Sequence, residues 1–138
     1  FADRRELPKE LRKLGASLGT IATGQTQITR NLHDQLGAYF ATSLSNFSIP
    51  MVLHGTDFTK SVWTALLKLP FGTTTSYADL SIALGNPTAT RAVARANGAN
   101  QIAILIPCHR VIGADGSLIG YAGGLWRKRA LLELERQP

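Results

Sequence analysis

The segment from Ile104 to Val111 constrains the fold more than any other part of the chain, because an apolar run leads directly into the only cysteine. It reads Ile-Leu-Ile-Pro-Cys-His-Arg-Val, and its branched apolar side chains are typical of a short buried strand. We therefore expect a strand that delivers Cys108 to a tight turn. Neighbours in an extended segment point to opposite sides, so His109 need not contact Cys108 and could act through a water molecule.

A cysteine beside a histidine permits two interpretations. The thiolate is the reactive form of cysteine, and a nearby imidazole is a usual means of producing it at neutral pH. A lone cysteine is nevertheless more often a small core residue, because free cysteine is among the most buried residue types. The pair Cys108-His109 alone does not choose between a nucleophile and a packing residue.

Length, composition and net charge limit the classes of protein to which this chain can belong. A chain of 138 residues with 44% hydrophobic residues is expected to form one main core. Fifteen Lys and Arg against nine acidic residues give a net charge of +6, which fits a polyanionic partner or merely a basic, soluble surface. A single cysteine and three scattered histidines provide neither a disulfide nor a zinc cluster. Without an apolar run long enough to span a membrane, the sequence predicts a soluble, intracellular protein.

Apolar residues at spacings of three and four predict four amphipathic helices along the chain. Between the second and third of these helices, the short apolar run from Ile49 to Leu53 is expected to be an extended link. The third helix has a capping residue in Gly55-Thr56-Asp57, and its Trp63 is expected in the core. These helices cover Leu7 to Leu18, Gln27 to Ser43, Phe58 to Lys68 and Leu125 to about Arg136.

Residues 76–98 predict a helix-turn-helix arrangement. A helix from Tyr77 to Leu84 is followed by the turn Gly85-Asn86-Pro87 and by a second helix from Thr88 to Asn97. A plain helical packing unit is an equally good interpretation of this pattern. The second helix is nevertheless expected to expose small side chains and two arginines four residues apart, which suits close approach to a nucleic acid backbone. These residues are Ala89, Ala92, Ala94, Ala96, Arg91 and Arg95.

The string Pro107-Cys108-His109-Arg110-Val111 resembles the active-site signature of the O6-alkylguanine-DNA alkyltransferases, also called methylated-DNA-protein cysteine methyltransferases. The resemblance covers roughly residues 56–135 and rests on blocks both before and after this string. The blocks are Ser76-Tyr77-Ala78-Asp79-Leu80, Gly85-Asn86-Pro87, Arg91-Ala92-Val93, Asn97-Gly98-Ala99-Asn100, Gly120-Tyr121-Ala122-Gly123-Gly124-Leu125 and Lys128 to Glu135.

For the fold, the resemblance implies an α+β protein that is mostly α. It implies a partial amino-terminal region and linker helix over residues 1–54, and a DNA-binding and alkyltransferase domain with a helix-turn-helix over residues 55–138. Members of this family usually carry a small β-sheet region before the point where Phe1 aligns. The amino-terminal α/β region is therefore expected to be truncated.

For the chemistry, the resemblance implies five catalytic residues. Cys108 accepts the alkyl group, His109 takes its proton through water, and Glu135 orients His109. Tyr77 protonates the guanine leaving group and also turns the 3′ phosphate, while Asn100 is a hinge between the helix-turn-helix and the active-site turn. From the residues alone, Asn100 could be a simple helix terminator. The hinge is favoured, because the next ordered element is the strand expected to deliver Cys108.

For the substrate, the resemblance implies that the second helix enters the minor groove and that Arg91 fills the space of a flipped nucleotide. Arg95, Ala92 and Ala94 complete the DNA-binding set with Tyr77. The pocket is expected to use the carbonyls of Cys108 and Val111 and the amide of Ala122, where many relatives have Ser, within a glycine-rich loop that includes Tyr121 and Gly123. By contrast, Arg127 and Arg129 are interpreted as a solvated helix face.

The function implied is direct repair, in which the alkyl group of O6-alkylguanine, and also of O4-alkylthymine, passes once and irreversibly to Cys108. The implied partner is double-stranded DNA, with no cofactor, metal or membrane, for a monomer in the cytoplasm or, in a eukaryote, the nucleus. Two rival classes are a non-catalytic binder of alkylated DNA and a helix-turn-helix regulator with an inert Cys108. A hydrolytic Cys-His enzyme is a more distant alternative, because it leaves Arg91 and Tyr77 without a purpose.

Overall fold

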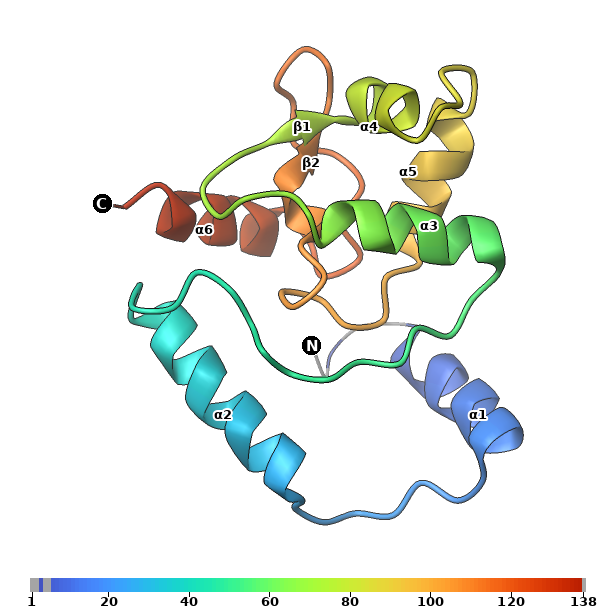
Figure 1. Cartoon of the computed structure of the whole chain (residues 1–138), viewed down its shortest axis with the longest axis vertical. Coiled ribbons are helices and arrows are strands. Elements are labelled where there is room, and N and C mark those ends of the chain that lie inside the picture. The colour runs from blue at the N-terminus through green and yellow to red at the C-terminus, as the bar shows by residue number, and fades with distance from the viewer. Residues whose placement is uncertain (1–2, 4–5, 138) are drawn as a thin grey trace.

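The helices begin where a capping side chain precedes an apolar stripe. The computed structural model describes residue 3 and residues 6–137, and it shows a mostly helical α+β fold (Figure 1). Helix α1 spans Leu7–Leu18, α2 spans Gln27–Phe40 and α3 spans Asp57–Leu66. Thr26 and Thr56 accept hydrogen bonds from the backbone amides of Thr29 and Thr59, and so cap α2 and α3. The three predicted helices are confirmed, although α2 ends three residues early, before the positive φ of Thr42.

The helix-turn-helix is also confirmed. Helix α4 spans Tyr77–Ala83 and is capped by Ser76, and helix α5 spans Thr90–Gly98. The turn between them uses Gly85 at a φ of 71°, which glycine adopts without steric cost. Strand β1 (Thr75–Ser76) leads into α4 and pairs in parallel with β2 (Val111–Ile112). This short pairing joins the start of the helix-turn-helix to the end of the cysteine segment.

The prediction of a strand before Cys108 is wrong. Residues 103–107 form turns with a single bridge between Ala103 and Ile106, and Cys108–Arg110 forms the short 3-10 helix η1. Ile104 has a φ of 77°, which is strained for a β-branched residue and incompatible with a strand. The side chain of Asn100 stabilises the turn by accepting from the amide of Ile102 and donating to the carbonyl of Ile106. Local side-chain hydrogen bonds thus outweigh the β-propensity of the run.

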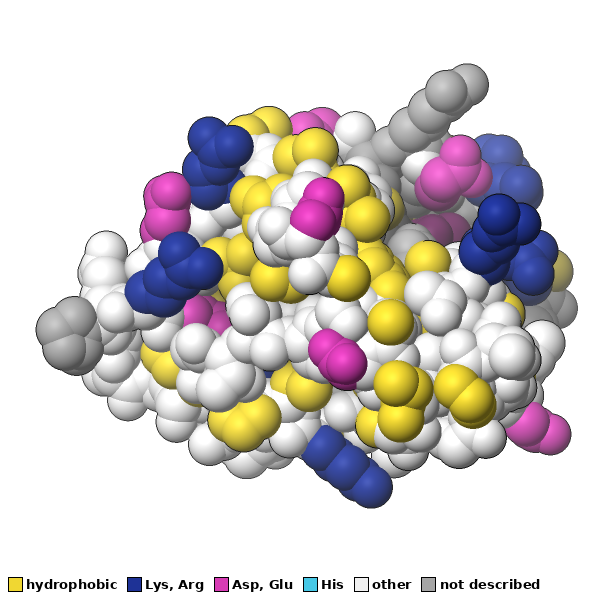
Figure 2. All heavy atoms as spheres, turned by 90° about the horizontal axis from the view of Figure 1, so that it is seen from above, with side chains coloured by type: hydrophobic (Ala, Val, Ile, Leu, Met, Phe, Trp, Pro, Cys, Tyr) yellow, Lys and Arg dark blue, Asp and Glu magenta, His cyan; other side chains and the backbone are white. Residues whose placement is uncertain are grey.

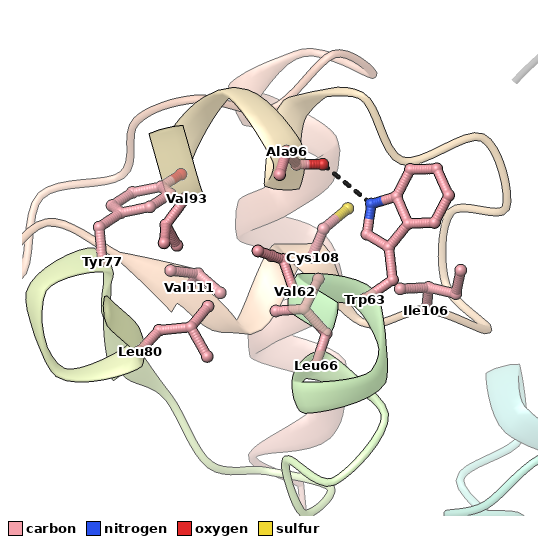
Figure 3. Close-up of a cluster of buried hydrophobic side chains, with 10 residues drawn as sticks. All are labelled: Val62, Trp63, Leu66, Tyr77, Leu80, Val93, Ala96, Ile106, Cys108 and Val111. Atoms are coloured by element: carbon pink, nitrogen blue, oxygen red, sulfur yellow. Dashed lines mark hydrogen bonds between the residues drawn. The ribbon is translucent and has the colours of Figure 1, made fainter. Parts of the chain in front are cut away.

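Cys108 lies inside the main hydrophobic core, which is shown in Figure 3. Trp63 of α3, expected in the core, is 2% exposed, and its Nε1 donates to the carbonyl of Ala96 at 2.9 Å. We expected Ala96 on the exposed face of the second helix of the helix-turn-helix. This expectation is wrong, because Ala96 of α5 is buried and faces α3. The core side chains come from α3, α4, α5 and η1 with their flanks: Val62, Trp63, Leu66, Tyr77, Leu80, Val93, Ala96, Ile106, Cys108 and Val111.

A second cluster joins the amino-terminal part to the last helix. Helix α6 spans Leu125–Glu135, close to its predicted bounds, and helices α1 and α2 lie below α3 and α6 in the view of Figure 1, on the side away from α4. The fully buried Tyr39 of α2 packs with Ile104 and with Leu131 of α6. Helix α1 has no buried residue. Among residue 3 and residues 6–137, no helix combines the length and apolar character needed to cross a membrane.

Candidate active site

The sulfur of Cys108 lies at the carboxyl-terminal end of α5, where a side-chain amide reaches it. Cys108 is 5% exposed, and Asn100 Nδ2 donates to its Sγ at 3.0 Å and to the carbonyl of Ile106 at 2.8 Å. Asn97 Nδ2 donates to the carbonyl of Cys108 at 3.4 Å. A donor aimed at sulfur favours the thiolate over the thiol. Asn100 therefore does more than terminate a helix, because it connects α5 to the active-site turn and to the sulfur itself.

His109 and Glu135 form a buried pair across η1 and α6. His109 Nε2 lies 2.8 Å from Glu135 Oε1, and both residues are almost fully buried. Arg110 binds the same carboxylate twice, through Nε to Oε2 at 2.8 Å and through Nη2 to Oε1 at 2.9 Å. The amide of Gly72 donates to Oε2 at 3.1 Å. The carboxylate that was expected to orient His109 is thus fixed by several donors.

The pKa values of Glu135 and His109 are both lowered, but by different physical causes. Burial alone would raise the pKa of Glu135, but hydrogen bonds from His109, Arg110 and Tyr39 outweigh it and hold the pKa well below its usual range. Burial lowers the pKa of His109, and the nearby positive charges of Arg110 and Lys128 act in the same direction against the pull of Glu135. We conclude that Glu135 is ionised, with Arg110 as its counter-charge, and that His109 is neutral.

These charges determine which nitrogen of His109 carries the proton. An ionised carboxylate only accepts hydrogen bonds, so Nε2 must be the protonated nitrogen that faces Glu135. In a neutral imidazole the other nitrogen, Nδ1, is then an unprotonated acceptor. Nδ1 is buried and hydrogen-bonds to no group within the described residues, Cys108 included. The geometry is that of a base that reaches the sulfur indirectly.

Lys128 is a site residue that sequence reasoning missed. Its side chain on α6 is fully buried, and Nζ donates to the carbonyl of Val111 at 2.6 Å and to that of Ile119 at 2.5 Å. Burial lowers the pKa of Lys128 to about 8, although a negative charge on Cys108 opposes the shift. In the sequence, Lys128 begins the resemblance block Lys128 to Glu135, which assigns it no role, and it lies in the run Trp126-Arg127-Lys128-Arg129, which is more typical of a solvated face.

Arg127 and Arg129, the two arginines beside Lys128, lie in different surroundings. Arg129 is exposed, as expected. Arg127 is not simply solvated, because its Nη1 donates to the carbonyl of Gly123 at 2.8 Å and its guanidinium stacks on the Trp126 ring. That expectation is wrong for Arg127, whose geometry attaches the glycine-rich loop to α6.

A narrow cavity beside Cys108 brings several predicted residues together. Tyr77 borders this region, since its hydroxyl donates to the carbonyl of Ile119 at 3.2 Å, and a Cβ on Gly120 would lie only 2.7 Å from that hydroxyl. Burial, together with negative charge on Cys108, raises the pKa of Tyr77. Val111 is buried but does not line the cavity, and its carbonyl already accepts from Lys128. The lining residues are Asn97, Gly98, Asn100, Ala103, Cys108, Gly120, Tyr121, Ala122 and Gly123.

Of the predicted DNA-binding residues on α5, Arg91 and Arg95 are exposed, whereas Ala92 and Ala94 are half-buried and Ala94 packs against the main hydrophobic core. Tyr77 belongs to α4 and is buried. Figure 2 views the molecule from the side that is uppermost in Figure 1, where α4 and α5 lie. Hydrophobic side chains gather near the centre of this face, and Lys and Arg side chains stand at its margin with acidic ones between them (Figure 2). Cations around an apolar surface suit contacts to a phosphate backbone.

Together, fold and site define a helix-turn-helix domain built around a buried cysteine, histidine and glutamate. A family described as 6-O-methylguanine DNA methyltransferase, DNA binding domain, matches residues 57–137. The chain is 58% identical over 103 residues to a Mycobacterium bovis methylated-DNA--protein-cysteine methyltransferase, covering 75% of this chain and 62% of that protein. A Mycolicibacterium paratuberculosis protein of the same name is 47% identical, with 99% and 85% covered.

Solved structures agree with these matches. The crystal structure of Mycobacterium tuberculosis OGT in complex with DNA superposes with a TM-score of 0.76 at 56% identity, covering 78% of this chain and 66% of that one. The chain therefore belongs to the 6-O-methylguanine DNA methyltransferase family. Its matched part spans slightly less than two thirds of the M. bovis relative.

Proposed function

We propose that this protein repairs alkylated DNA directly, by moving the alkyl group of O6-alkylguanine, and of O4-alkylthymine, onto Cys108. The observation that carries the proposal is the placement of a nearly buried Cys108 sulfur. Cys108 lines a cavity at the end of α5, and its sulfur receives a hydrogen bond from Asn100. The next residue, His109, is paired with Glu135. The names of the relatives support the same reaction.

The chemistry is a displacement at carbon. His109 Nδ1 takes the thiol proton through one water, and Glu135 holds the imidazole in place. The Cys108 sulfur then forms a bond to the alkyl carbon as the bond from that carbon to guanine O6 breaks. The departing guanine takes a proton from Tyr77, whose raised pKa keeps the hydroxyl protonated until then. The products are a thioether at Cys108 and an unmodified guanine, and no cofactor enters the reaction.

Access to the alkyl group requires base flipping, which costs a few kcal/mol of unstacking and unpairing. Helix α5 enters the minor groove, where the half-buried Ala92 and Ala94 permit close approach, and the exposed Arg91 fills the vacated stack. Arg95 contacts phosphate. The carbonyls of Cys108 and Val111 and the amide of Ala122 then hold the base beside Tyr121 and Gly123. The M. tuberculosis structure with DNA supports DNA as the partner.

The remaining assignments follow the same proposal. The amino-terminal unit covers residues 1–54, and the DNA-binding and alkyltransferase unit covers residues 55–138. The protein acts as a monomer in the cytoplasm, or in the nucleus of a eukaryote. A non-catalytic DNA binder is the second candidate, but it gives no purpose to the Asn100 contact with sulfur or to the buried His109.

Replacement of the nucleophile separates these candidates. We expect Cys108→Ala to abolish transfer of labelled methyl from O6-methylguanine duplex to protein, because the chain has no other cysteine. Binding to the same duplex should persist, since α5 supplies the docking surface. Transfer is read on a denaturing gel and binding by fluorescence anisotropy. Parallel loss of binding would contradict this division of roles, and absence of transfer by the wild type would favour the non-catalytic binder.

A further inference from the structure

Tyr39 contacts the active-site carboxylate from a distant part of the chain. Its hydroxyl donates to Glu135 Oε1 at 2.7 Å, although 96 residues separate the two in sequence. Tyr39 lies at the end of α2 and Glu135 at the end of α6, where the two helices come together (Figure 1). It precedes residues 57–137, where the family match lies.

The hydroxyl is not needed to fill space. The Tyr39 ring is 0% exposed and packs against Phe40, Phe47 and Phe71, with ring centroids 5.3, 5.4 and 5.9 Å away. In such surroundings a phenylalanine would bury the same ring without the cost of desolvating a hydroxyl. We therefore attribute the role of the Tyr39 hydroxyl to its hydrogen bond with Glu135.

Tyr39 and His109 share one carboxylate oxygen. Glu135 Oε1 accepts from Tyr39 Oη and from His109 Nε2, at 2.7 and 2.8 Å. Burial, followed by the bond to Glu135, raises the pKa of Tyr39, so its hydroxyl stays protonated and donates. Arg110 Nη2 donates to the same oxygen at 2.9 Å, so the Tyr39 hydroxyl is one of three donors that fix Oε1 and withdraw part of its negative charge. Less charge then remains to stabilise a protonated His109.

We propose that Tyr39 is a positioning residue for the alkyl transfer: its hydroxyl fixes the Glu135 carboxylate and thereby keeps His109 oriented and neutral as the base. The inference rests on the proposed function. The other charged groups at the cluster are Arg110, on both carboxylate oxygens, and Lys128, near His109. Both disfavour a proton on His109, and the Tyr39 hydroxyl adds a neutral donor at Oε1 beside the guanidinium of Arg110. The amino-terminal part of the chain thus contributes directly to the site.

The test compares Tyr39→Phe with Phe47→Leu, which disturbs the same aromatic cluster but keeps the hydroxyl. Two quantities are measured for each: the His109 pKa by NMR titration of the free protein, and the dependence of the transfer rate on pH. The His109 signal is assigned by its absence from His109→Gln. Thermal melts show that each variant is folded.

In Tyr39→Phe we expect the His109 pKa and the acidic limb of the rate profile to rise together by about 0.5 pH unit. At neutral pH the rate should fall at least about threefold, because a carboxylate with fewer supports orients its histidine less well. In Phe47→Leu neither the His109 pKa nor the acidic limb of the rate profile should shift. An unchanged His109 pKa in Tyr39→Phe, or an equal shift in Phe47→Leu, overturns the inference. The NMR reading does not depend on transfer, so failure of the proposed function would be recognised separately, as no transfer by the wild type.

Discussion

At the residue scale, the side-chain amide of Asn100 contacts the sulfur on which the proposed reaction depends. Asn100 is buried and satisfies three groups at once: the sulfur of Cys108, the carbonyl of Ile106 and the amide of Ile102. The same side chain therefore stabilises both the turn that places the sulfur and the negative charge that forms on it. Its structural and chemical contributions cannot be removed separately by deletion.

Asn100→Ala is accordingly expected to lower the free energy of unfolding by about 2 kcal/mol, because it leaves buried backbone groups without partners. Transfer should also slow about tenfold or more as the thiolate loses its donor. Urea unfolding and single-turnover rates measure the two effects. Asn46→Ala, at an exposed asparagine, is the matched control and should change stability by less than about 0.5 kcal/mol. A normal transfer rate in Asn100→Ala would refute the role in thiolate stabilisation.

At the scale of elements, α5 connects the surface proposed to face DNA to the sulfur of Cys108. Its outer side exposes Arg91 and Arg95, while its inner side is attached to α3 through the Ala96 carbonyl and Trp63 Nε1. The helix ends at Gly98, two residues before Asn100, whose side chain donates to the sulfur of Cys108. An arginine on this helix can therefore serve DNA binding without any contact to the reacting atoms.

Arg91→Ala should thus slow repair of duplex DNA far more, by about tenfold or greater, than reaction with free O6-benzylguanine. The reason is that only the duplex needs a side chain to fill the vacated stack. Single-turnover rates on both substrates provide the comparison. Arg129→Ala removes the same charge from an exposed position on α6, and it controls for a general electrostatic effect. Equal losses on both substrates in Arg91→Ala would assign Arg91 to the fold or the pocket.

Helices were predictable from the sequence where local signals agree. Thr26 and Thr56 cap apolar stripes, so the positions of α2 and α3 follow from spacing and capping. The segment before Cys108 was not predictable in this way, because Ile104 adopts a positive φ within a turn that Asn100 stabilises through hydrogen bonds with Ile102 and Ile106. The string from Pro107 to Val111 was recognisable through its resemblance to the family signature. Lys128 was missed because the two carbonyls that receive it, of Val111 and Ile119, come from other segments.

At the scale of the whole molecule, the buried charges make stability depend on pH. In the unfolded chain His109 takes up a proton as the pH falls through its ordinary pKa of 6.5, whereas in the folded chain burial delays that uptake. The unfolded state then binds more protons, so stability decreases as the pH falls below about 6.5. Glu135 acts in the same direction at lower pH, because its folded pKa lies below the ordinary 4.5.

The free energy of unfolding should therefore decrease between pH 6.5 and pH 5, and His109→Gln should make this decrease smaller. Chemical denaturation at a series of pH values measures both slopes. Because the variant retains His33 and His54, the difference between the slopes reports on His109 alone. Identical slopes in the two proteins would show that His109 takes up its proton equally in the folded and unfolded states.

The central claim is that one chain accepts one alkyl group on Cys108 and is then spent. The product is a thioether, and displacement at carbon leaves no acyl intermediate for water to hydrolyse. The chain has no second cysteine to receive the group. Intact mass spectrometry after incubation with excess O6-methylguanine duplex, followed by peptide mapping, tests the claim most directly. The account predicts a plateau at one added methyl group per chain, located on the peptide that contains Cys108. Continued repair by chains whose Cys108 remains unmodified would contradict it.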